Sequence, residues 1–561
     1  MIRLLSAIIL LVVSVSFQSL QAAEGEALRS LPVQDAGRIK PYDSFARETL
    51  ELIYGKQSFK REGDGARKEP AYLIVLSFVL APESWIKIPL FEVTHLDVKT
   101  QMGLPADKKH FTGTELFENP QFKNLMQELA DKRASKEKLT PYFQALQRLE
   151  NQMFTFREMS AGRLLKVVPA TDRDSWLSIS ELTGKHQELF INLSQAYAKR
   201  LGEIATNQVE GKSEVAAAKL LDQAVLDFQN SVAESVATNS GHSIVYPGKT
   251  AAEVFYNDVH PFRWAYILYL TAALILLFIW IRGMSSGMTF VWALSILGFV
   301  IHTVGFAYRI YLAERPPVTN MYETVVWMSW GAVLFAMILE KIYRFKSLLL
   351  SGILVGLISM IIADSAPAVL DPSIQPLEAV LRSNYWLIVH VMTITISYSA
   401  FALSWGLGNM GLVYYLVDEN KYHSEIQKIA TGVYRSMQIG VSFLAPGIIL
   451  GGVWADYSWG RFWGWDPKET WALIALMGYI VVLHARLVNW VQNFGMVISG
   501  VVTFSLVIMA WYGVNFVLGA GLHSYGFGAG GVEYVSTFFA LQVLFVLYVV
   551  LSRKISGRKK V

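Results

Sequence analysis

The sequence predicts a mainly α-helical, polytopic membrane protein, in which a bundle of about nine membrane-spanning helices follows an exported, helix-rich domain. The first observation is composition, because 53% of the 561 residues are hydrophobic, more than a soluble protein usually carries. The second is distribution, because the long apolar segments follow residue 261 and most Lys and Glu residues precede it. We therefore divide the chain into residues 1–23, 24–258 and 259–561.

Residues 1–23 show the pattern of a signal peptide, with a positive residue near the start, an apolar core over residues 4–15 and alanines at the end. The positions three before those alanines hold Leu20 and Gln21 rather than small residues that favour cleavage. The segment is therefore either a cleaved signal peptide or an uncleaved membrane anchor. Both alternatives place residues 24–258 on the periplasmic or outer side.

The region 24–258 is mostly polar and is long enough to bury a core of its own. Residues 119–150 and 185–237 show the apolar period of amphipathic helices. We expect a separate helical domain here, although no motif within these helices indicates a chemical role.

From residue 262 onward, nine apolar segments are each long enough to cross about 30 Å of hydrocarbon. If the preceding domain is outside, the inner turns and the C-terminal tail carry the Lys and Arg residues, as the positive-inside rule requires. The outer loops then carry mainly Asp and Glu. The nine segments are 262–282, 285–313, 322–341, 347–364, 385–417, 434–453, 471–490, 496–518 and 534–552.

The net charge of +4 follows from the inner turns and the basic tail, so no nucleic-acid-binding patch is needed to explain it. The chain has no cysteine, which excludes a disulfide and a thiolate metal site. Any thiol chemistry must therefore use the cysteines of a partner protein.

The segment Trp454–Trp471 holds five tryptophans, several charged residues and a proline between the sixth and seventh apolar segments. It is too polar to cross a bilayer, so we expect an outer loop over residues 454–471. Flat indole faces beside a membrane suit a large planar apolar ligand such as a porphyrin, which makes Trp459, Trp463 and Trp465 candidate contacts. The alternative is an interfacial aromatic belt, because Trp and Tyr gather at the headgroup level of most membrane proteins.

Two histidines fall on the same predicted side as this loop, His390 near the start of the fifth apolar segment and His523 in a glycine-rich loop after the eighth. Two neutral imidazoles that approach from opposite sides are a natural axial pair for haem iron. Each alone is typical of a hydrogen-bonded interfacial histidine. The pair flanks a tryptophan-rich loop, and this favours iron ligation.

His484 and His302 lie inside predicted spans, where an ionisable side chain is costly and is therefore a candidate for function. The competing interpretation is a buried histidine that a backbone carbonyl satisfies. We favour a function for His484, and for His302 both interpretations stay open. The remaining histidines are assigned ordinary structural roles: His95, His110, His186, His242, His260 and His423.

The connection between the second and third spans contains a proline pair, Arg315 and Glu323, and Arg309 precedes it. One interpretation is that Arg309 or Arg315 contacts haem propionates. The other is that these arginines anchor the connection, and the sequence does not separate the two.

Together these motifs resemble the CcsA/ResC component of the System II cytochrome c synthase over residues 262–552, about half of the chain. The tryptophan motif resembles that family's WWD signature, and P-V-Q-D-x-G-R-I-K-P (Pro32–Pro41) resembles the extracytoplasmic segment of longer bacterial members. The matching motifs are, in order, P-x-x-N-x-Y-E (Pro317–Glu323), S-x-Y-W-L-x-x-H-V (Ser383–Val391), W-G-x-F-W-x-W-D-P-K-E-T-W (Trp459–Trp471), L-H-x-R (Leu483–Arg486) and G-L-H-S-Y-G (Gly521–Gly526).

The resemblance implies a role for each candidate. His390 and His523 would bind haem iron at an outer site, and His484 would bind it in transit within the membrane. The aromatic loop, with Asp466, would hold the ring. The family's CcsB/ResB subunit supplies another membrane histidine, and no comparable multi-span half precedes residue 262. We therefore expect that a separate CcsB/ResB-like chain supplies that ligand, or that His302 substitutes for it.

The implied reaction joins the two vinyl groups of haem b, a bound substrate in transit, to the thiols of a C-x-x-C-H segment of apocytochrome c through thioether bonds. On this hypothesis the chain is part of a holocytochrome c synthase of the bacterial inner membrane and is active only with its partner subunit. No residue is assigned a catalytic step beyond positioning haem. Asp466 and Glu469 would orient neighbouring groups or contact the substrate.

Three rival functions remain. A haem exporter would bind and release haem without forming a bond, and the sequence alone does not separate it from a lyase. The System I proteins CcmF and CcmC also carry WWD loops, but the exported domain and G-L-H-S-Y-G argue against both. An unrelated transporter with aromatic belts would instead show helices broken at the membrane midplane.

Overall fold

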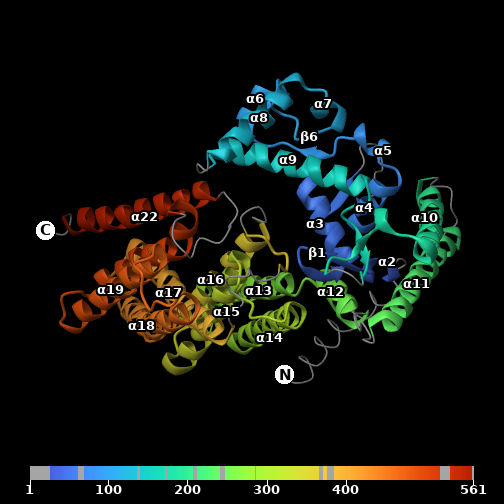
Figure 1. The fold of residues 1–561 in the computed structure, drawn as a ribbon. Helices are drawn as coiled ribbons and strands as arrows, with labels where there is room; N and C mark the ends of the chain where they lie inside the picture. The colour runs from blue at the N-terminus through green and yellow to red at the C-terminus, as the bar shows by residue number, and fades with distance from the viewer. Residues whose placement is uncertain are drawn as a thin grey trace. The chain divides into compact units, whose positions relative to one another are not determined.

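The computed structural model of the chain describes residues 26–60, 68–135, 139–170, 174–205, 212–240, 247–284, 286–365, 370–375, 384–518 and 531–558. These residues belong to two compact units, Met1–Val259 and His260–Val561, whose elements are labelled in Figure 1. The predicted signal segment 1–23 lies outside the described residues.

The first unit is helical apart from short strands that pair in two-stranded antiparallel sheets. The run predicted at 119–150 contains α8 and the first half of α9, and the run at 185–237 contains α10 and most of α11. Its elements are α2 (Glu26–Ser30), β1 (Pro32–Asp35), β2 (Arg38–Pro41), α3 (Tyr42–Tyr54), β3 (Ser58–Lys60), β4 (Lys68–Pro70), α4 (Ala71–Leu80), α5 (Glu83–Ile86), β5 (Phe91–Glu92), α6 (Leu96–Gln101), β6 (His110–Phe111), α7 (Gly113–Phe117), α8 (Pro120–Ala134), α9 (Pro141–Ser160), β7 (Lys166–Val168), β8 (Leu177–Ser178), η1 (Ile179–Glu181), α10 (Gly184–Ala205), α11 (Lys212–Ser240) and α12 (Pro247–Val259).

The first unit has its own hydrophobic core, built mainly from α3, α4 and α9. Helix α4 is apolar along its length, but its ten residues are too few to cross a bilayer. Leu50, Phe78 and Phe156 are buried where these helices meet. The apolar face of α4 is therefore explained by burial inside the unit.

A buried polar network ties both ends of this unit together. Asp43, at the start of α3, accepts hydrogen bonds from Nε of Arg29 at 3.1 Å and from Nε of Arg47 at 2.8 Å. Burial alone would raise the pKa of Asp43, but the two guanidinium groups outweigh it and hold the pKa below its ordinary value. In α12, Glu253 accepts two hydrogen bonds from Arg38, at 2.7 and 2.8 Å. Helix α12 is thereby fixed to the β1–β2 hairpin.

Nine helices in the described part of the chain are long and apolar enough to cross a membrane, by length and composition, and this confirms the predicted fold class of a polytopic helical bundle. All of them lie at or beyond the end of the first unit. The elements of the second unit are α13 (Pro261–Ile281), α14 (Met288–Ala313), α15 (Met321–Tyr343), α16 (Lys346–Ser365), α17 (Asn384–Asp418), α18 (His423–Trp459), α19 (Pro467–Leu487), α20 (Asn493–Val502), α21 (Phe504–Ile508), η3 (Met509–Leu518) and α22 (Val532–Arg558).

The centre of the second unit is α17, which packs most extensively on α18 and also contacts α15, α16, α20 and α22. Small residues let these helices approach closely, since an added Cβ at Gly440 of α18 would overlap the ring of Phe401 on α17. The eighth span is divided into α20, α21 and η3, and η3 is a π-helix. Such a stretch is rare and often marks a functional site.

We expect Asp43→Asn to lower the free energy of unfolding of the first unit by about 1–3 kcal/mol at pH 7, because Arg29 and Arg47 each lose one of two carboxylate partners and keep only Asp258. The pKa of Asp43 is depressed in the folded state. The Asp43 carboxylate therefore stabilises the folded unit fully above the unfolded pKa of about 3.9. This stabilisation is lost as the pH falls through the pKa of the folded state. Limited proteolysis of the purified protein in urea, from pH 7 to pH 3, measures both effects.

The matched control is Glu158→Gln, which breaks an exposed pair with Arg163. Wild-type protease resistance in Asp43→Asn, or equal losses in both variants, would contradict the assigned role of the network.

Candidate functional site

The candidate site is formed where the first turns of α17, the last turns of α18 and the start of α19 meet. His390 of α17 lies with Nδ1 2.8 Å from the carbonyl oxygen of Gly447 on α18. A carbonyl can only accept a hydrogen bond, so Nδ1 carries the proton and the lone pair of the neutral ring is on Nε2. This is the tautomer that a metal-binding histidine uses when it coordinates through Nε2.

Glycines of α18 make room for this imidazole. A Cβ added at Gly451 would lie 2.5 Å from Cε1 of His390, and one added at Gly447 would lie 2.9 Å from Cδ1 of Ile394. Any larger residue at Gly451 would therefore displace the ring from its hydrogen bond. The orientation of His390 therefore depends on Gly451, which lies one helical turn after Gly447, the residue whose carbonyl accepts the hydrogen bond from His390.

The structure shortens the loop predicted at 454–471. Helix α18 continues to Trp459 and α19 begins at Pro467, so only Gly460–Asp466, here named the tryptophan connection, joins them. Gly460 ends α18 in the left-handed conformation, with φ of +68°. The predicted loop is therefore a helix end, a short connection and a helix start.

The aromatic side chains form two edge-to-face pairs around the connection. Trp454 is buried and lies 4.7 Å from Trp459 between ring centroids, and Trp463 lies 5.8 Å from Trp465. Trp465 is 70% exposed and adopts a φ of +56°, which residues other than glycine rarely use. The connection therefore presents Trp465 outward, whereas Trp454 belongs to the packing of the bundle.

Charged side chains fix the shape of the connection. The Glu469 carboxylate accepts hydrogen bonds from the backbone N–H of Gly464 at 2.8 Å and of Asp466 at 3.1 Å. The guanidinium of Arg461 lies 5.8 Å from the Trp459 ring and occupies the space that a side chain at residue 464 would need. A side chain at residue 464 would therefore displace the Arg461 guanidinium from this position.

Asp466 is the N-cap of α19. Its Oδ1 accepts a hydrogen bond from the backbone N–H of Lys468 at 2.9 Å, and it forms a capping box with Glu469. The side chain is almost fully buried. Of the two roles expected for this carboxylate, orienting neighbouring groups agrees with these contacts.

His523 and the G-L-H-S-Y-G motif lie outside the described residues. The described chain before them ends in η3, which packs on α19. Leu506, just before η3, meets Gly478 in the middle of α19. Helix α19 and the span formed by α20, α21 and η3 are consecutive and run in opposite directions. The end of η3 at Leu518 is therefore directed toward the start of α19.

His484 is exposed on the inner part of α19, and its Nδ1 lies 2.8 Å from the carbonyl oxygen of Ile480 in the same helix. Nδ1 therefore carries the proton, as in His390, and the lone pair is on Nε2. Helix α19 is a peripheral span, because only 11% of its apolar window is buried, against 72% for α16. The His484 imidazole therefore reaches the surface of the described bundle.

His302 is enclosed. It is fully buried, with its ring stacked on Phe306 at 5.3 Å and edge-on to Phe262 at 5.5 Å. Its Nδ1 lies 3.4 Å from the hydroxyl of Tyr269, and Nε2 has no hydrogen bond of ordinary geometry within the described ranges. Helix α14 packs on α13 and α15, whereas α19 packs on α18 and η3, so His302 is not brought together with His484.

Arg309 and Arg315 share one carboxylate. Nη2 of Arg309 lies 2.8 Å from Oε1 of Glu323, and Nη1 of Arg315 lies 3.0 Å from its Oε2. The same arginines donate to the carbonyls of Pro372 at 2.9 Å and Gln375 at 2.8 Å. These contacts favour the interpretation that the arginines anchor a connection rather than meet haem propionates.

Sequence reasoning missed Gly447, Gly451, Arg461 and Gly464. A signal was present for the glycines of α18, because Gly440, Gly447 and Gly451 recur at helical spacing on one face. No comparable signal marks Arg461, whose role depends on the fold of the connection.

The chain is similar to proteins of cytochrome c biogenesis. A family model described as cytochrome C assembly protein matches residues 318–523. Protein NrfI of Wolinella succinogenes is 28% identical over 527 residues, 88% of this chain and 53% of NrfI, so the chain spans about half the length of that relative. CcsA, a cytochrome c biogenesis protein, is 34% identical in Prochlorococcus marinus over 245 residues, 37% of this chain and 76% of that protein. The CcsA of Guillardia theta is 33% identical over 236 residues, with the same shares of 37% and 76%. Because it covers most of CcsA proteins that are more than 30% identical to it, the chain belongs to the CcsA family of cytochrome c biogenesis proteins.

Proposed function

We propose that this chain presents haem at the outer end of its bundle and, with a CcsB/ResB-like partner, supports covalent attachment of that haem to the C-x-x-C-H segment of apocytochrome c. The observation that carries the proposal is the hydrogen bond from Nδ1 of His390 to the Gly447 carbonyl, beside the tryptophan connection. Ligating histidines usually donate their other ring N–H to such an acceptor, which fixes the tautomer and the ring orientation. Membership of a cytochrome c biogenesis family supports haem as the molecule that is bound.

Haem is the substrate of the proposed reaction. Each cysteine thiol adds across one vinyl group, so that sulfur bonds to one vinyl carbon and the thiol hydrogen ends on the other. This addition needs neither oxidant nor reductant, and the contribution expected of the protein is positioning. His390 and His523 are the proposed axial ligands, and the histidine of the C-x-x-C-H segment replaces one of them as attachment proceeds.

The tryptophan connection is the proposed wall for the ring. Trp465 and Phe462 are exposed, and Tyr457 at the end of α18 is 75% exposed. Glu469 and Arg461 hold the connection in one shape without a ligand, so binding a flat molecule there requires little additional ordering.

His484 is the proposed transit ligand within the membrane. Its exposure on a peripheral helix supports a site completed by another chain. His302 is less suited to that role, because aromatic rings surround it and its helix does not pack on α19. We therefore assign the second membrane ligand to a CcsB/ResB-like partner and treat His302 as a packing residue.

Co-expression with a CcsB/ResB-like protein and an apocytochrome c, in cells that lack their own maturation system, tests the function. Covalent haem in the cytochrome supports the lyase. Haem bound to this chain without any covalent product would instead support an exporter.

We expect His390→Ala to open one axial position and to lower cytochrome maturation at least about tenfold. Added imidazole should restore part of the activity, because a free ligand can fill the vacancy. Gly451→Ala should weaken haem retention about ten- to hundredfold, since its Cβ would lie 2.5 Å from the His390 ring. Absorption spectra of the purified variants report the axial ligands.

Gly440→Ala is the matched control for Gly451→Ala, because it crowds the same pair of helices at Phe401 and leaves His390 untouched. If both glycine variants lose haem equally, or if His390→Ala keeps the native spectrum, the assignment of His390 is wrong.

Removal of the transit ligand should reduce haem at the outer site as well. We expect His484→Ala to lower haem content and maturation, whereas His302→Leu should alter stability but leave the spectrum of the retained haem unchanged. Haem content per protein, measured after purification with the partner, distinguishes the two. Full occupancy in His484→Ala would make that residue structural.

Trp465→Ala should weaken haem retention by about 1–3 kcal/mol, or roughly 5- to 150-fold in affinity, because the ligand loses a large aromatic contact. Membrane insertion and expression should persist, since Trp465 is 70% exposed. The control is Trp490→Ala, which removes an exposed tryptophan at the other end of α19. If Trp465→Ala retains haem but fails to accumulate, the connection is an anchor.

A further inference from the structure

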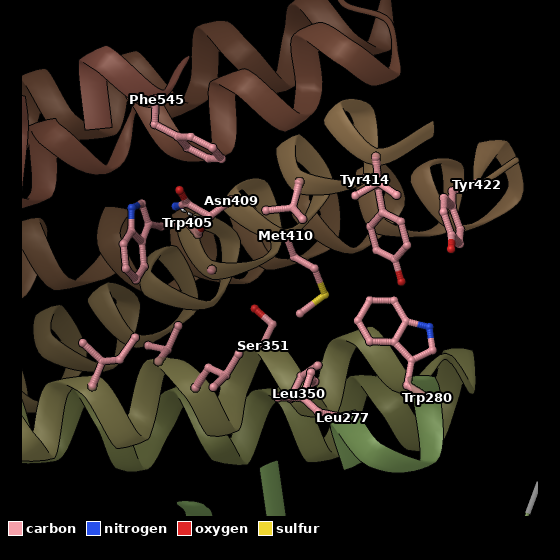
Figure 2. Close-up of a pocket in the computed structure, with 16 residues that line it drawn as sticks. Leu277, Trp280, Leu350, Ser351, Trp405, Asn409, Met410, Tyr414, Tyr422 and Phe545 are labelled. Atoms are coloured by element: carbon pink, nitrogen blue, oxygen red, sulfur yellow. Dashed lines mark hydrogen bonds between the residues drawn. The ribbon is translucent and has the colours of Figure 1, made fainter. Parts of the chain in front are cut away.

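A cavity of about 420 Å³ lies in the second unit between α13, α16, α17 and α22 (Figure 2). Its residue Tyr422 precedes the start of α18, whereas the tryptophan connection follows the end of that helix. Its walls are apolar, and Leu277, Leu350, Met410 and Phe545 contribute to them. It contains none of the residues assigned to haem in the preceding sections.

The cavity opens sideways on the surface of the bundle. Trp280 of α13 and Ile358 of α16 are 39% and 45% exposed, and Val417 of α17 is 65% exposed. In a membrane this opening meets the lipid hydrocarbon. An apolar chain can therefore enter it without crossing water.

One wall carries a buried hydroxyl that lacks a partner. Ser351 is 1% exposed, and among the described residues its Oγ has no hydrogen bond. Figure 2 shows this side chain projecting from α16 toward the α17 wall, where Asn409 also lines the cavity. An unsatisfied buried hydroxyl costs about 1–3 kcal/mol, so an acceptor that reached the Ser351 hydroxyl would stabilise the bound state.

The end of the cavity nearest the α17–α18 turn has an aromatic edge. The ring centroids of Trp280 and Tyr414 are 5.3 Å apart, and those of Tyr414 and Tyr422 are 5.0 Å apart. Amphipathic rings of this kind mark the headgroup level of a bilayer. The turns at this end of the bundle carry Lys and Arg residues, which collect on the cytoplasmic side of membrane proteins. The aromatic edge is therefore assigned to the cytoplasmic headgroup level.

Three cations lie on the helix ends and turns next to this edge. Nζ of Lys421 lies 5.2 Å from the Tyr422 ring, Lys346 donates to the Met284 carbonyl at 3.3 Å, and Arg282 ends α13 two residues after Trp280. Within the described ranges none of the three has an ion-pair partner. Of the acidic residues of this region, Glu419 pairs with Arg553 and Glu425 with Lys428, and Asp418 accepts the backbone N–H of Lys421 at 3.0 Å.

The spacing of these groups fits one kind of molecule. Lys346 is the first residue of α16, and Ser351 lies five residues further, about 7.5 Å along the helix axis. Leu354 and Ile358 continue the same wall with apolar side chains. Along the axis of α16, an amine, a hydroxyl and apolar side chains therefore follow one another in the order of the phosphate, ester and acyl parts of a phospholipid.

We propose that this cavity binds an anionic phospholipid of the cytoplasmic leaflet. One acyl chain occupies the cavity, an ester oxygen accepts the hydrogen bond of Ser351, and the phosphate pairs with Arg282, Lys346 and Lys421. A porphyrin fits less well, because none of the described residues that line the cavity is a histidine. The proposal is independent of the assigned haem sites.

The test uses the full-length protein in detergent, supplied with equal amounts of phosphatidylglycerol and phosphatidylethanolamine of the same chain length. Mass spectrometry then measures the lipid retained after exchange. We expect preferential retention of phosphatidylglycerol by the wild type and at least fivefold less in Arg282→Gln/Lys346→Gln/Lys421→Gln. The control Lys341→Gln/Arg435→Gln/Lys554→Gln makes the same charge change elsewhere and should stay within twofold of the wild type.

A second pair of variants tests the cavity itself. Val413→Trp places a large side chain at the mouth, at a position that is 47% exposed, and should reduce lipid retention at least fivefold. Ile449→Trp, at an exposed position of α18, should have no effect. Equal retention of both lipids, or wild-type retention in either the triple glutamine variant or Val413→Trp, would overturn the proposal. The proposal would also be overturned if Val413→Trp kept its lipid but lost haem or released a co-purifying polypeptide.

Discussion

The hydrogen bond between His390 and the carbonyl of Gly447 is the contact on which the proposed haem site depends. It selects the tautomer of the imidazole and leaves the lone pair of the neutral ring on Nε2. The contact exists only because α17 and α18 approach closely along a row of glycines, so helix packing and ligand chemistry are set by the same residues. A change that separates these helices would disturb the proposed iron ligand before it unfolds the bundle.

The tryptophan connection adds a second constraint at the same end. Its backbone is held by Glu469, and the Arg461 guanidinium lies in the space left by Gly464. The exposed indole of Trp465 is therefore carried by a short, hydrogen-bonded segment between two helix ends. Such a surface can meet a flat substrate on one side and a cysteine-containing peptide on the other, without a large rearrangement.

The membrane spans could be predicted from the sequence because the length of an apolar run is a local property. The ends of α18 and α19 could not be taken from hydropathy, since helices continue into polar sequence wherever a cap satisfies their termini. Asp466-Pro467-Lys468-Glu469 is itself a capping signal, with the cap residue, a proline at the first position and a glutamate at the third. The pairing of His390 with Gly447 depends on how two spans are aligned, and the exposure of His484 depends on which helices cover α19. Neither is encoded in local spacing.

The central claim is that His390 binds haem iron through Nε2 while its Nδ1 stays bonded to Gly447. A structure of the haem-loaded protein with its partner, determined by electron cryomicroscopy, tests this claim most directly. The account predicts iron bonded to Nε2 of His390, the Nδ1 contact with the Gly447 carbonyl retained, and the ring beside Trp465. Iron bonded elsewhere, with His390 still turned toward Gly447 and no haem at the tryptophan connection, would contradict it.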